Sequence, residues 1–322
     1  MSDDKIMFPH VIDSTMLAAL RSCPQKMYRS YMQHWKPKAD SVHLVAGGAF
    51  ASGLEAARRA FFVDGQSHEE AEAAGMIALI EHYGDFECPA DSAKSLERMC
   101  GALVYYFEQY RMGEDGMTPI KLADGSQGIE FSFAVPLPVM HPVTGIPLIF
   151  AGRADLIAEF AGGVYLEDDK TTKSLGPSWT RQWEMRGQFT GYAWAARESG
   201  IHTDGTIVRG VSILKTKYET MSVLTYRPDW EIDRWLKQSC RDLERLKLMW
   251  QEGYYDYALD GACGEYGGCP MQITCKSKEP EAWFPLYFKQ RVWDPIGRTE
   301  MGVKEWEDSW DHTGKSACVT SE

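Results

Sequence analysis

The chain of 322 residues lacks several features that would place it in a membrane or a secretory route. It has no uninterrupted apolar run of about 18 residues, the length that a transmembrane helix requires. Its first residues, Met1 to Lys5, lack the basic and apolar regions of a secretory signal. Internal repeats and low-complexity segments are also lacking. We therefore expect a cytoplasmic protein with no membrane span, whose eight cysteines are kept reduced.

The chain has 34 lysines and arginines against 46 aspartates and glutamates, so its formal net charge is −12. This charge argues against a surface that binds polyanions everywhere, although a local basic strip can coexist with an acidic body. The hydrophobic content of 44% is sufficient for a substantial core, in one large domain or two small ones.

The middle of the chain predicts a β-hairpin. Phe150 to Phe160 is apolar and strand-like, Ala161 to Gly163 is a turn signal, and Val164 to Leu166 resumes the strand. Counting back from the turn places Asp155 nearly opposite Asp168. Facing Cβ atoms on antiparallel strands are only ~5 Å apart, so the two carboxylates should lie close together.

Lys170 adds a positive charge at the same place. Because side chains alternate along a strand, Lys170 shares a face with Asp168, while Asp169 points away. Two carboxylates and an ammonium suit a divalent cation, Mg²⁺ or Mn²⁺, that activates water for phosphodiester cleavage. The alternative is a solvated acidic hairpin in which Lys170 only pairs with Asp155.

A helix is expected from about Ser178 to Glu198. Gln188 and Tyr192 are one turn apart and share a face, with Arg181 two turns before Gln188. An ordinary amphipathic helix with a half-buried tyrosine would show the same pattern.

These three segments together resemble the PD-(D/E)xK nuclease superfamily, and within it the RecB-type branch. That branch carries G-x-x-D, then D/E-x-K-T, then Q-x-x-x-Y, which correspond to Gly152–Asp155, Asp168–Thr171 and Gln188–Tyr192. The resemblance implies a metal-dependent deoxyribonuclease, acting as an exonuclease on DNA ends or single strands. CRISPR-associated and phage RecB-like exonucleases share this architecture, which implies a role in recombination, repair or defence, with protein partners there.

The resemblance also implies roles for individual residues. Asp155, Asp168 and the carbonyl of Asp169 would bind the metal, and Lys170 would orient or activate the attacking water. Gln188 and Tyr192 would lie beside the catalytic centre and touch DNA. Further DNA contacts are expected from basic residues that follow the motif, although scattered solubilising charge would look the same: Lys173, Arg181, Lys215 and Lys217, beside Lys170 and Arg186.

One position departs from the RecB-type pattern. These nucleases usually carry a histidine on an early helix, in a G-x-x-x-H-x-x-L-E-like setting, and Ala51 stands in its place here. Glu55 or Glu130 could supply another metal-binding carboxylate, although Glu55 also reads as a solvent-facing helical residue. The missing histidine leaves open a second hypothesis, a catalytically weak, nuclease-like subunit that binds DNA within a recombination or CRISPR-type complex.

Three cysteines near the C-terminus form a C-x5-C-x5-C pattern: Cys263, Cys269 and Cys275. A fourth, Cys23, precedes a proline far upstream. This arrangement resembles iron–sulfur RecB-type nucleases, which implies a structural four-iron–four-sulfur cluster, although the usual first gap is two residues. Soft thiolates would also hold tetrahedral zinc, and unligated reduced cysteines are the remaining interpretation.

The predicted fold class is α/β, with the mixed central sheet of the PD-(D/E)xK core flanked by helices. We expect a helical N-terminal block at 1–128 that carries Cys23, a nuclease core at 129–255, and a Cys-rich segment with a C-terminal tail at 256–322. Within these ranges the patterns predict helices at about 49–62, 67–83, 92–112 and 229–251, and strands at about 129–135, 147–159, 164–170, 206–214 and 221–226.

Overall fold

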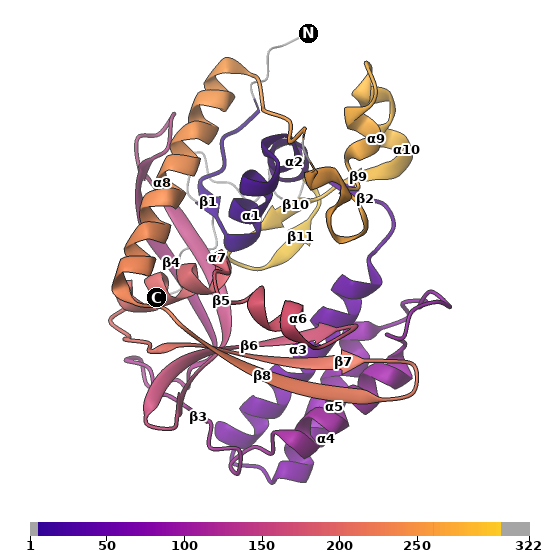
Figure 1. Cartoon of the computed structure of the whole chain (residues 1–322), viewed down its shortest axis with the longest axis vertical. Helices are drawn as coiled ribbons and strands as arrows, with labels where there is room; N and C mark the ends of the chain where they lie inside the picture. The colour runs from indigo at the N-terminus through magenta and orange to yellow at the C-terminus, as the bar shows by residue number, and fades with distance from the viewer. Residues whose placement is uncertain (1–5, 260, 304–322) are drawn as a thin grey trace. The chain divides into compact units, whose positions relative to one another are not determined.

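The computed structural model of the chain describes residues 6–259 and 261–303 (Figure 1). The chain divides into two compact units, each built from separated segments. The first unit contains residues up to 39, residues 133–152 and residues from 234 onward, and the second contains 40–132 and 153–233. Most of the predicted C-terminal tail, including Cys318, lies outside the described residues. No described helix is both long enough and apolar enough to cross a membrane.

The second unit is built around a mixed sheet, as the sequence predicts. Strands β5 (Pro147–Phe160) and β6 (Gly163–Thr172) form the antiparallel hairpin. Strand β7 (Gly205–Ile213) pairs parallel with β6, and β8 (Tyr218–Tyr226) pairs antiparallel with β7. The short β3 (Thr118–Pro119) and the longer β4 (Ile129–Met140) both pair with β5, of which β3 joins the end near the hairpin turn.

Helices α3 (Val42–Phe62) and α5 (Leu96–Gln109) cover one face of the β6–β8 sheet, and α4 (His68–Tyr83) packs on these two helices (Figure 1). Their apolar sides bury a large cluster against Val211 and Ile213 of β7. Helix α3 begins at Val42, about two turns before the start predicted near residue 49, and therefore contains Gly47 and Gly48. The His82 imidazole of α4 lies against Gly48, so that an added Cβ there would be 2.6 Å from His82 Nε2.

The other face of the same strands is covered by α6 (Pro177–Arg181) and α7 (Gly187–Glu198). The single helix predicted from Ser178 to Glu198 is therefore wrong, because residues 182–186 form turns between two helices. Trp183 is buried at this break, and its carbonyl accepts a hydrogen bond from Arg227 Nη2 at 2.6 Å. Arg181 consequently lies on a different helix from Gln188.

The first unit begins with β1 (Val11–Ile12), which pairs parallel with the start of β5. Helix α1 (Ser14–Ser22) follows and is capped by Asp13, whose carboxylate accepts from the Met16 amide at 2.7 Å. Next come α2 (Pro24–Met27), the π-helix η1 (Tyr28–Met32) and β2 (Trp35–Pro37). Helix α8 (Asp229–Glu252) continues from the second unit into the first.

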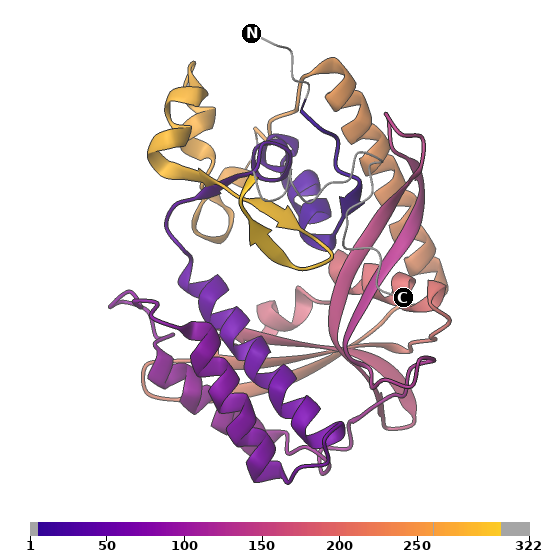
Figure 2. The ribbon, with the colours of Figure 1, turned by 180° about the vertical axis from the view of Figure 1, so that it is seen from behind.

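The C-terminal part of the first unit consists of short elements. They are η2 (Ala262–Gly267), α9 (Gln272–Cys275), η3 (Pro280–Ala282), α10 (Phe284–Tyr287), β9 (Phe288–Gln290), β10 (Val292–Asp294) and β11 (Thr299–Met301). Strand β9 pairs antiparallel with β2, so segments that are about 250 residues apart in the chain lie side by side in one unit (Figure 2). Trp293 Nε1 also donates to Asp13 Oδ2 at 2.7 Å.

Candidate active site

The hairpin brings the two predicted aspartates together. Leu156 pairs with Glu167 in the β5–β6 ladder, so the adjacent residues Asp155 and Asp168 face each other. The backbone amide of Asp169 donates to Asp155 Oδ2 at 3.0 Å, which fixes this carboxylate against β6. The opposition obtained by counting back from the turn is therefore present in the structure.

Lys170 and the glutamine–tyrosine pair complete the cluster. The Lys170 ammonium forms an ion pair with the Asp168 carboxylate. From α7, Gln188 Nε2 lies 3.5 Å from Asp168 Oδ1 and 3.2 Å from the Tyr192 hydroxyl oxygen. The five residues predicted to be catalytic thus come from three elements, β5, β6 and α7, and gather at one place.

Burial controls the electrostatics of this cluster. Asp168 is only 3% exposed, and burial raises its pKa to about 7 against the opposing effect of Lys170, while Asp155 raises it further. Burial lowers the pKa of Lys170, but Asp168 and Asp155 outweigh this effect, so its pKa is raised overall. Lys170 is therefore held as an ammonium, suited to orienting groups and stabilising negative charge more than to accepting a proton.

The donor set fits a hard divalent cation. The carboxylates of Asp155 and Asp168 and the nearby carbonyl of Asp169 are oxygen donors, the type that Mg²⁺ and Mn²⁺ prefer. Among residues 6–259 and 261–303, no three acidic, histidine or cysteine side chains are already grouped to hold one ion. In this structure Lys170 pairs with Asp168 and the Asp169 amide binds Asp155.

The two further candidate carboxylates, Glu55 and Glu130, are placed around Arg153. Arg153 Nε forms a close ion pair with Glu130, and its Nη1 lies 3.9 Å from Glu55 Oε2. Glu55 also accepts a hydrogen bond from Arg59 Nε at 3.0 Å. Arg153 precedes Asp155 by two residues and shares its face of β5. A metal-binding role for either glutamate remains a prediction.

The opposite face of β6 carries an ionic network that the sequence did not reveal. Arg58 of α3 is buried, and its Nη2 lies 2.7 Å from Glu167 Oε2 and 2.8 Å from Asp169 Oδ2. The Tyr106 hydroxyl of α5 donates to Asp169 Oδ1 at 2.7 Å. The Asp169 side chain is therefore held by Arg58 and Tyr106 on one face of the sheet, and the Asp169 backbone amide is held by the Asp155 carboxylate.

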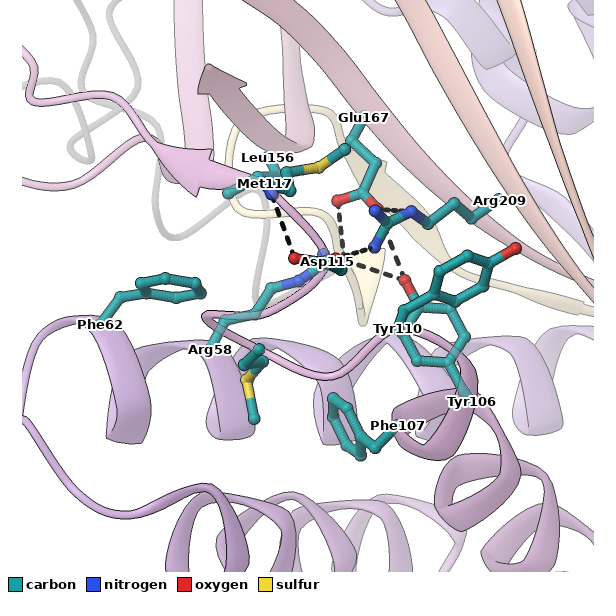
Figure 3. A pocket seen from close by; sticks show the side chains of 11 residues that line it. Arg58, Phe62, Tyr106, Phe107, Tyr110, Asp115, Met117, Leu156, Glu167 and Arg209 are labelled. Carbon is teal, nitrogen blue, oxygen red and sulfur yellow. Dashed lines mark hydrogen bonds and ion pairs between the residues drawn. The ribbon is translucent and has the colours of Figure 1, made fainter. Parts of the chain in front are cut away.

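The network continues to β7 around a small cavity of about 20 Å³ (Figure 3). Arg209 Nε lies 3.1 Å from Glu167 Oε1, and its Nη1 lies 2.8 Å from Asp115 Oδ2. Burial raises the pKa of Glu167 to about 7 against the opposing effect of Arg58. The only sequence signal for this network is the pair of acidic residues at alternating positions of β6, on its helix-covered face.

The basic residues predicted to contact DNA lie outside β5, β6 and α7, at or just after the ends of other elements or of β6. Lys173 follows β6, Arg181 ends α6, and Lys215 and Lys217 lie at the turn between β7 and β8. The Lys217 ammonium lies 2.5 Å from a carboxylate oxygen of Glu219.

The sequence did not single out Lys94, which lies just before α5 and whose side chain reaches the end of β6. Its Nζ donates to Thr171 Oγ1 at 2.7 Å. Burial, followed by the charge of Lys173, lowers the pKa of Lys94 to about 8. The end of the motif-bearing strand therefore carries more positive charge than Lys173 alone provides.

The four predicted metal-binding cysteines line a single cavity of about 180 Å³ in the first unit. Cys23 lies between α1 and α2, and the other three lie on η2, α9 and the turn that joins them. The Cys269 amide donates to the Cys263 carbonyl at 2.9 Å, and Gly268 has a φ of +107°, so a tight turn takes up the longer first gap. The four cysteines supply the soft donors that an iron–sulfur cluster or zinc prefers, and in this structure their side chains line the cavity without being grouped around one ion position.

A sequence model of the PD-(D/E)XK nuclease superfamily matches residues 14–276. The match spans most of the chain and includes the hairpin, α7 and the cysteine segment. The chain belongs to the PD-(D/E)XK nuclease superfamily, whose members generally use Mg²⁺ or Mn²⁺. Its fold is α/β, as expected, with a central sheet of parallel and antiparallel strands that is flanked by helices.

Three solved structures resemble the chain at low identity. A candidate exonuclease from Eubacterium rectale is 13% identical, with a TM-score of 0.49 over 83% of this chain and 94% of that one. The protein SSO0001 is 14% identical, with a TM-score of 0.29 over 62% and 74% of the two chains. LHK-Exo in complex with dAMP is 15% identical, with a TM-score of 0.24 over 64% and 94%. No curated protein matches the sequence.

Proposed function

We propose that this nuclease belongs to the RecB-type branch and is an exonuclease that hydrolyses phosphodiesters at DNA ends or in single strands. The observation that supports the proposal is the convergence of Asp155, Asp168 and Lys170 at the hairpin, with Gln188 in contact with Asp168. A solvated acidic hairpin, the alternative interpretation, does not account for an Asp168 that is 3% exposed.

Each residue has a role in this proposal. Asp155, Asp168 and the carbonyl of Asp169 would hold Mg²⁺ or Mn²⁺. The cation supplies polarisation of the phosphoryl oxygen and a lower pKa for the attacking water. The Lys170 ammonium orients that water and stabilises the charge that develops on the phosphate. Gln188 holds the Asp168 carboxylate, and Tyr192 holds the Gln188 amide.

Substrate contacts extend the proposal beyond the catalytic cluster. Gln188 and Tyr192 lie on the helix next to the reacting phosphate, and the basic residues would bind neighbouring phosphates: Lys173, Arg181, Lys215 and Lys217. Ordered phosphate contacts of this type would make binding dependent on salt concentration. We place the activity in the cytoplasm, in recombination, repair or defence, where protein partners are expected.

A digestion assay tests this function directly. Protein purified without oxygen is incubated with end-labelled single-stranded and duplex DNA and Mn²⁺, and cleavage of each substrate is followed. We expect Lys170→Ala to lower the rate by about 10²–10³-fold, the loss typical of removing one charge-stabilising donor. Lys121→Ala, which changes an exposed lysine of the same unit, is the matched control and should keep the wild-type rate.

A catalytically weak, DNA-binding subunit is the second candidate. Ala51, at the position where RecB-type nucleases usually carry a histidine, favours it. The same assay separates the two candidates, because the weak subunit would bind DNA while Lys170→Ala and wild type cleave at equal low rates. EDTA would abolish cleavage only in the first case.

We also infer that Cys23, Cys263, Cys269 and Cys275 hold a four-iron–four-sulfur cluster with a structural role. The shared cavity supports this assignment, because it brings one early and three late cysteines to the same place. Anaerobically purified protein should be brown and contain iron and acid-labile sulfide. A colourless protein that contains stoichiometric zinc would contradict the cluster and support the zinc site.

A further inference from the structure

A buried arginine touches the cysteine cavity. Arg29 lies within the π-helix η1 and is only 3% exposed. Its Nη1 donates to Cys275 Sγ at 3.0 Å and also to the hydroxyl oxygen of Thr274. Arg29 thus contacts one of the four cysteines directly, from the helical segment that follows Cys23.

The other neighbours of this guanidinium are neutral. When the Gln25 amide is assigned with its oxygen toward Arg29, that oxygen accepts from Nε at 3.1 Å and from Nη2 at 3.2 Å. The Phe284 ring centroid lies 5.8 Å from the guanidinium carbon. Among the carboxylates whose side chains the structure describes, none forms an ion pair with Arg29. A buried cation without a counter-charge is unfavourable, so this position calls for an anion.

Cys275 is the one contacting group that can become that anion. Its sulfur is the polarisable atom that Arg29 Nη1 approaches at 3.0 Å. A metal that binds the sulfurs converts them to thiolates. Four thiolates around a dication leave two uncompensated negative charges, and the Arg29 guanidinium is positioned to offset one of them.

We propose that Arg29 is the counter-cation of a thiolate-bound metal centre in the cysteine cavity. The proposal rests on the cofactor assigned above, and is independent of nuclease activity. Its consequence differs for the two kinds of centre. Hydrogen bonds and charges at the sulfurs set the potential of an iron–sulfur cluster, and a nearby cation favours the more negative, reduced form. For zinc, the same cation favours retention of the thiolates.

The test compares wild type with Arg29→Met and Arg29→Lys in the full chain, purified without oxygen. Iron, acid-labile sulfide and zinc contents identify the centre, and its rate of loss to a chelator is measured. We expect Arg29→Met to lose the centre about tenfold faster and Arg29→Lys to show a smaller change. If the centre is a cluster, the ratio of reduced to oxidised form should fall tenfold at a given potential, a shift of 59 mV for one electron.

Thr274→Val is the matched control, because it removes the hydroxyl that Arg29 also contacts but leaves every charge in place. It should keep the potential of the cluster, or the zinc affinity, close to wild type. Circular dichroism checks the folding of each variant, and if Arg29→Met does not fold, Arg29→Gln, which also removes the charge but keeps a polar side chain, takes its place.

Three results would overturn the proposal. The first is an unchanged potential and an unchanged metal retention in the arginine variants. The second is an equal shift in Thr274→Val, which would make the role one of packing. The third is a wild-type protein that binds neither iron–sulfur nor zinc. A negative nuclease assay affects none of these measurements, so the two proposals fail separately.

Discussion

Asp169 shows how one residue joins the two faces of β6. Its side chain is held by Arg58 and Tyr106 on the helix-covered face, and its amide binds Asp155 at the candidate active site. The ionic network therefore supports the strand at the point where Asp168 and Lys170 project to the other side. Burial of so many charges is costly, and its benefit here is a fixed position for the residues around the hairpin.

Arg58→Met should strongly destabilise the protein. The change removes the guanidinium that Glu167 and Asp169 share, which leaves Glu167 with Arg209 and Asp169 with the Tyr106 hydroxyl. Removal of one member of a buried ion pair costs about 3–5 kcal/mol. Urea denaturation provides the measurement. Arg59→Met, next along the same helix, removes an exposed pair with Glu55 and should cost less than about 1 kcal/mol. Equal losses in the two variants would show that the network adds no stability.

His34 should make stability dependent on pH. Burial, followed by the charge of Lys36, lowers the pKa of His34 to about 4. The unfolded chain therefore binds this proton near pH 6.5 and the folded chain only near pH 4, so stability is lost as pH falls through this interval. His34→Asn, which suits the φ of +64°, should reduce this loss by on the order of 1–3 kcal/mol.

Urea denaturation of both proteins at pH 7.5 and pH 4.5 measures the effect. The exposed His202→Asn is the control and should keep the wild-type pH dependence. A parallel pH dependence in His34→Asn and wild type would show that His34 titrates normally in the folded protein.

At the residue scale, the sequence predicts contacts between residues that are close together in the chain. The meeting of Asp155 and Asp168 follows from a turn signal between them, and alternation along the strand places Lys170. Arg58 and Glu167 are separated by 109 positions, and the sequence does not name Glu167 as the partner of either Arg58 or the adjacent Arg59. Contacts of this kind depend on how α3 packs on the sheet, which is a property of the whole unit.

Among the elements, the contact between α3 and α4 depends on two glycines. A Cβ added to Gly75 would lie 2.6 Å from the Gly53 carbonyl oxygen and 3.0 Å from Ala57 Cβ. A Cβ added to Gly53 would lie 3.0 Å from the Gly75 carbonyl oxygen. The two helices therefore approach with their backbones in contact, which larger residues at these positions would prevent.

Gly75→Ala should destabilise the second unit by about 1–3 kcal/mol, because overpacking outweighs the better helix propensity of alanine. Gly47→Ala is the matched control within α3. A Cβ there meets no atom within 4 Å, so this change should stabilise the protein by about 0.5–1 kcal/mol. Thermal unfolding compares the two variants, and a gain in stability for both would refute the close contact.

The sequence predicted most elements of the second unit, because their hydrophobic periods are regular. The break at Trp183 was missed, since this residue fits the apolar side of a continuous helix and only the distant Arg227 claims its carbonyl. The short elements after 260 were not predicted either. They are stabilised by β2 and by the stacking of Trp35 on Phe284, at a centroid distance of 4.7 Å, and not by a periodic pattern of their own.

For the whole molecule, the cysteine cavity joins segments from both ends of the chain. Cys23→Ser should loosen the cavity, because the late cysteines lose their connection to α1 and α2. Hydrogen exchange of anaerobically purified protein should become about tenfold faster across 261–276, while the amides of α4 in the second unit keep their rates. Cys240→Ser, which changes a half-buried cysteine of α8, is the control. Equal exchange in both variants would contradict the prediction.

The positions of the site residues in the chain set the order in which they are translated. The second unit ends at residue 233, so every residue around the hairpin has been translated before Cys263, Cys269 and Cys275 exist. At ~5–20 residues per second, Cys23 waits on the order of 10–50 s for these three partners. A nascent chain therefore holds Cys23 without these three thiols throughout this interval, and a centre that needs all four cysteines is assembled only after Cys275 has been made.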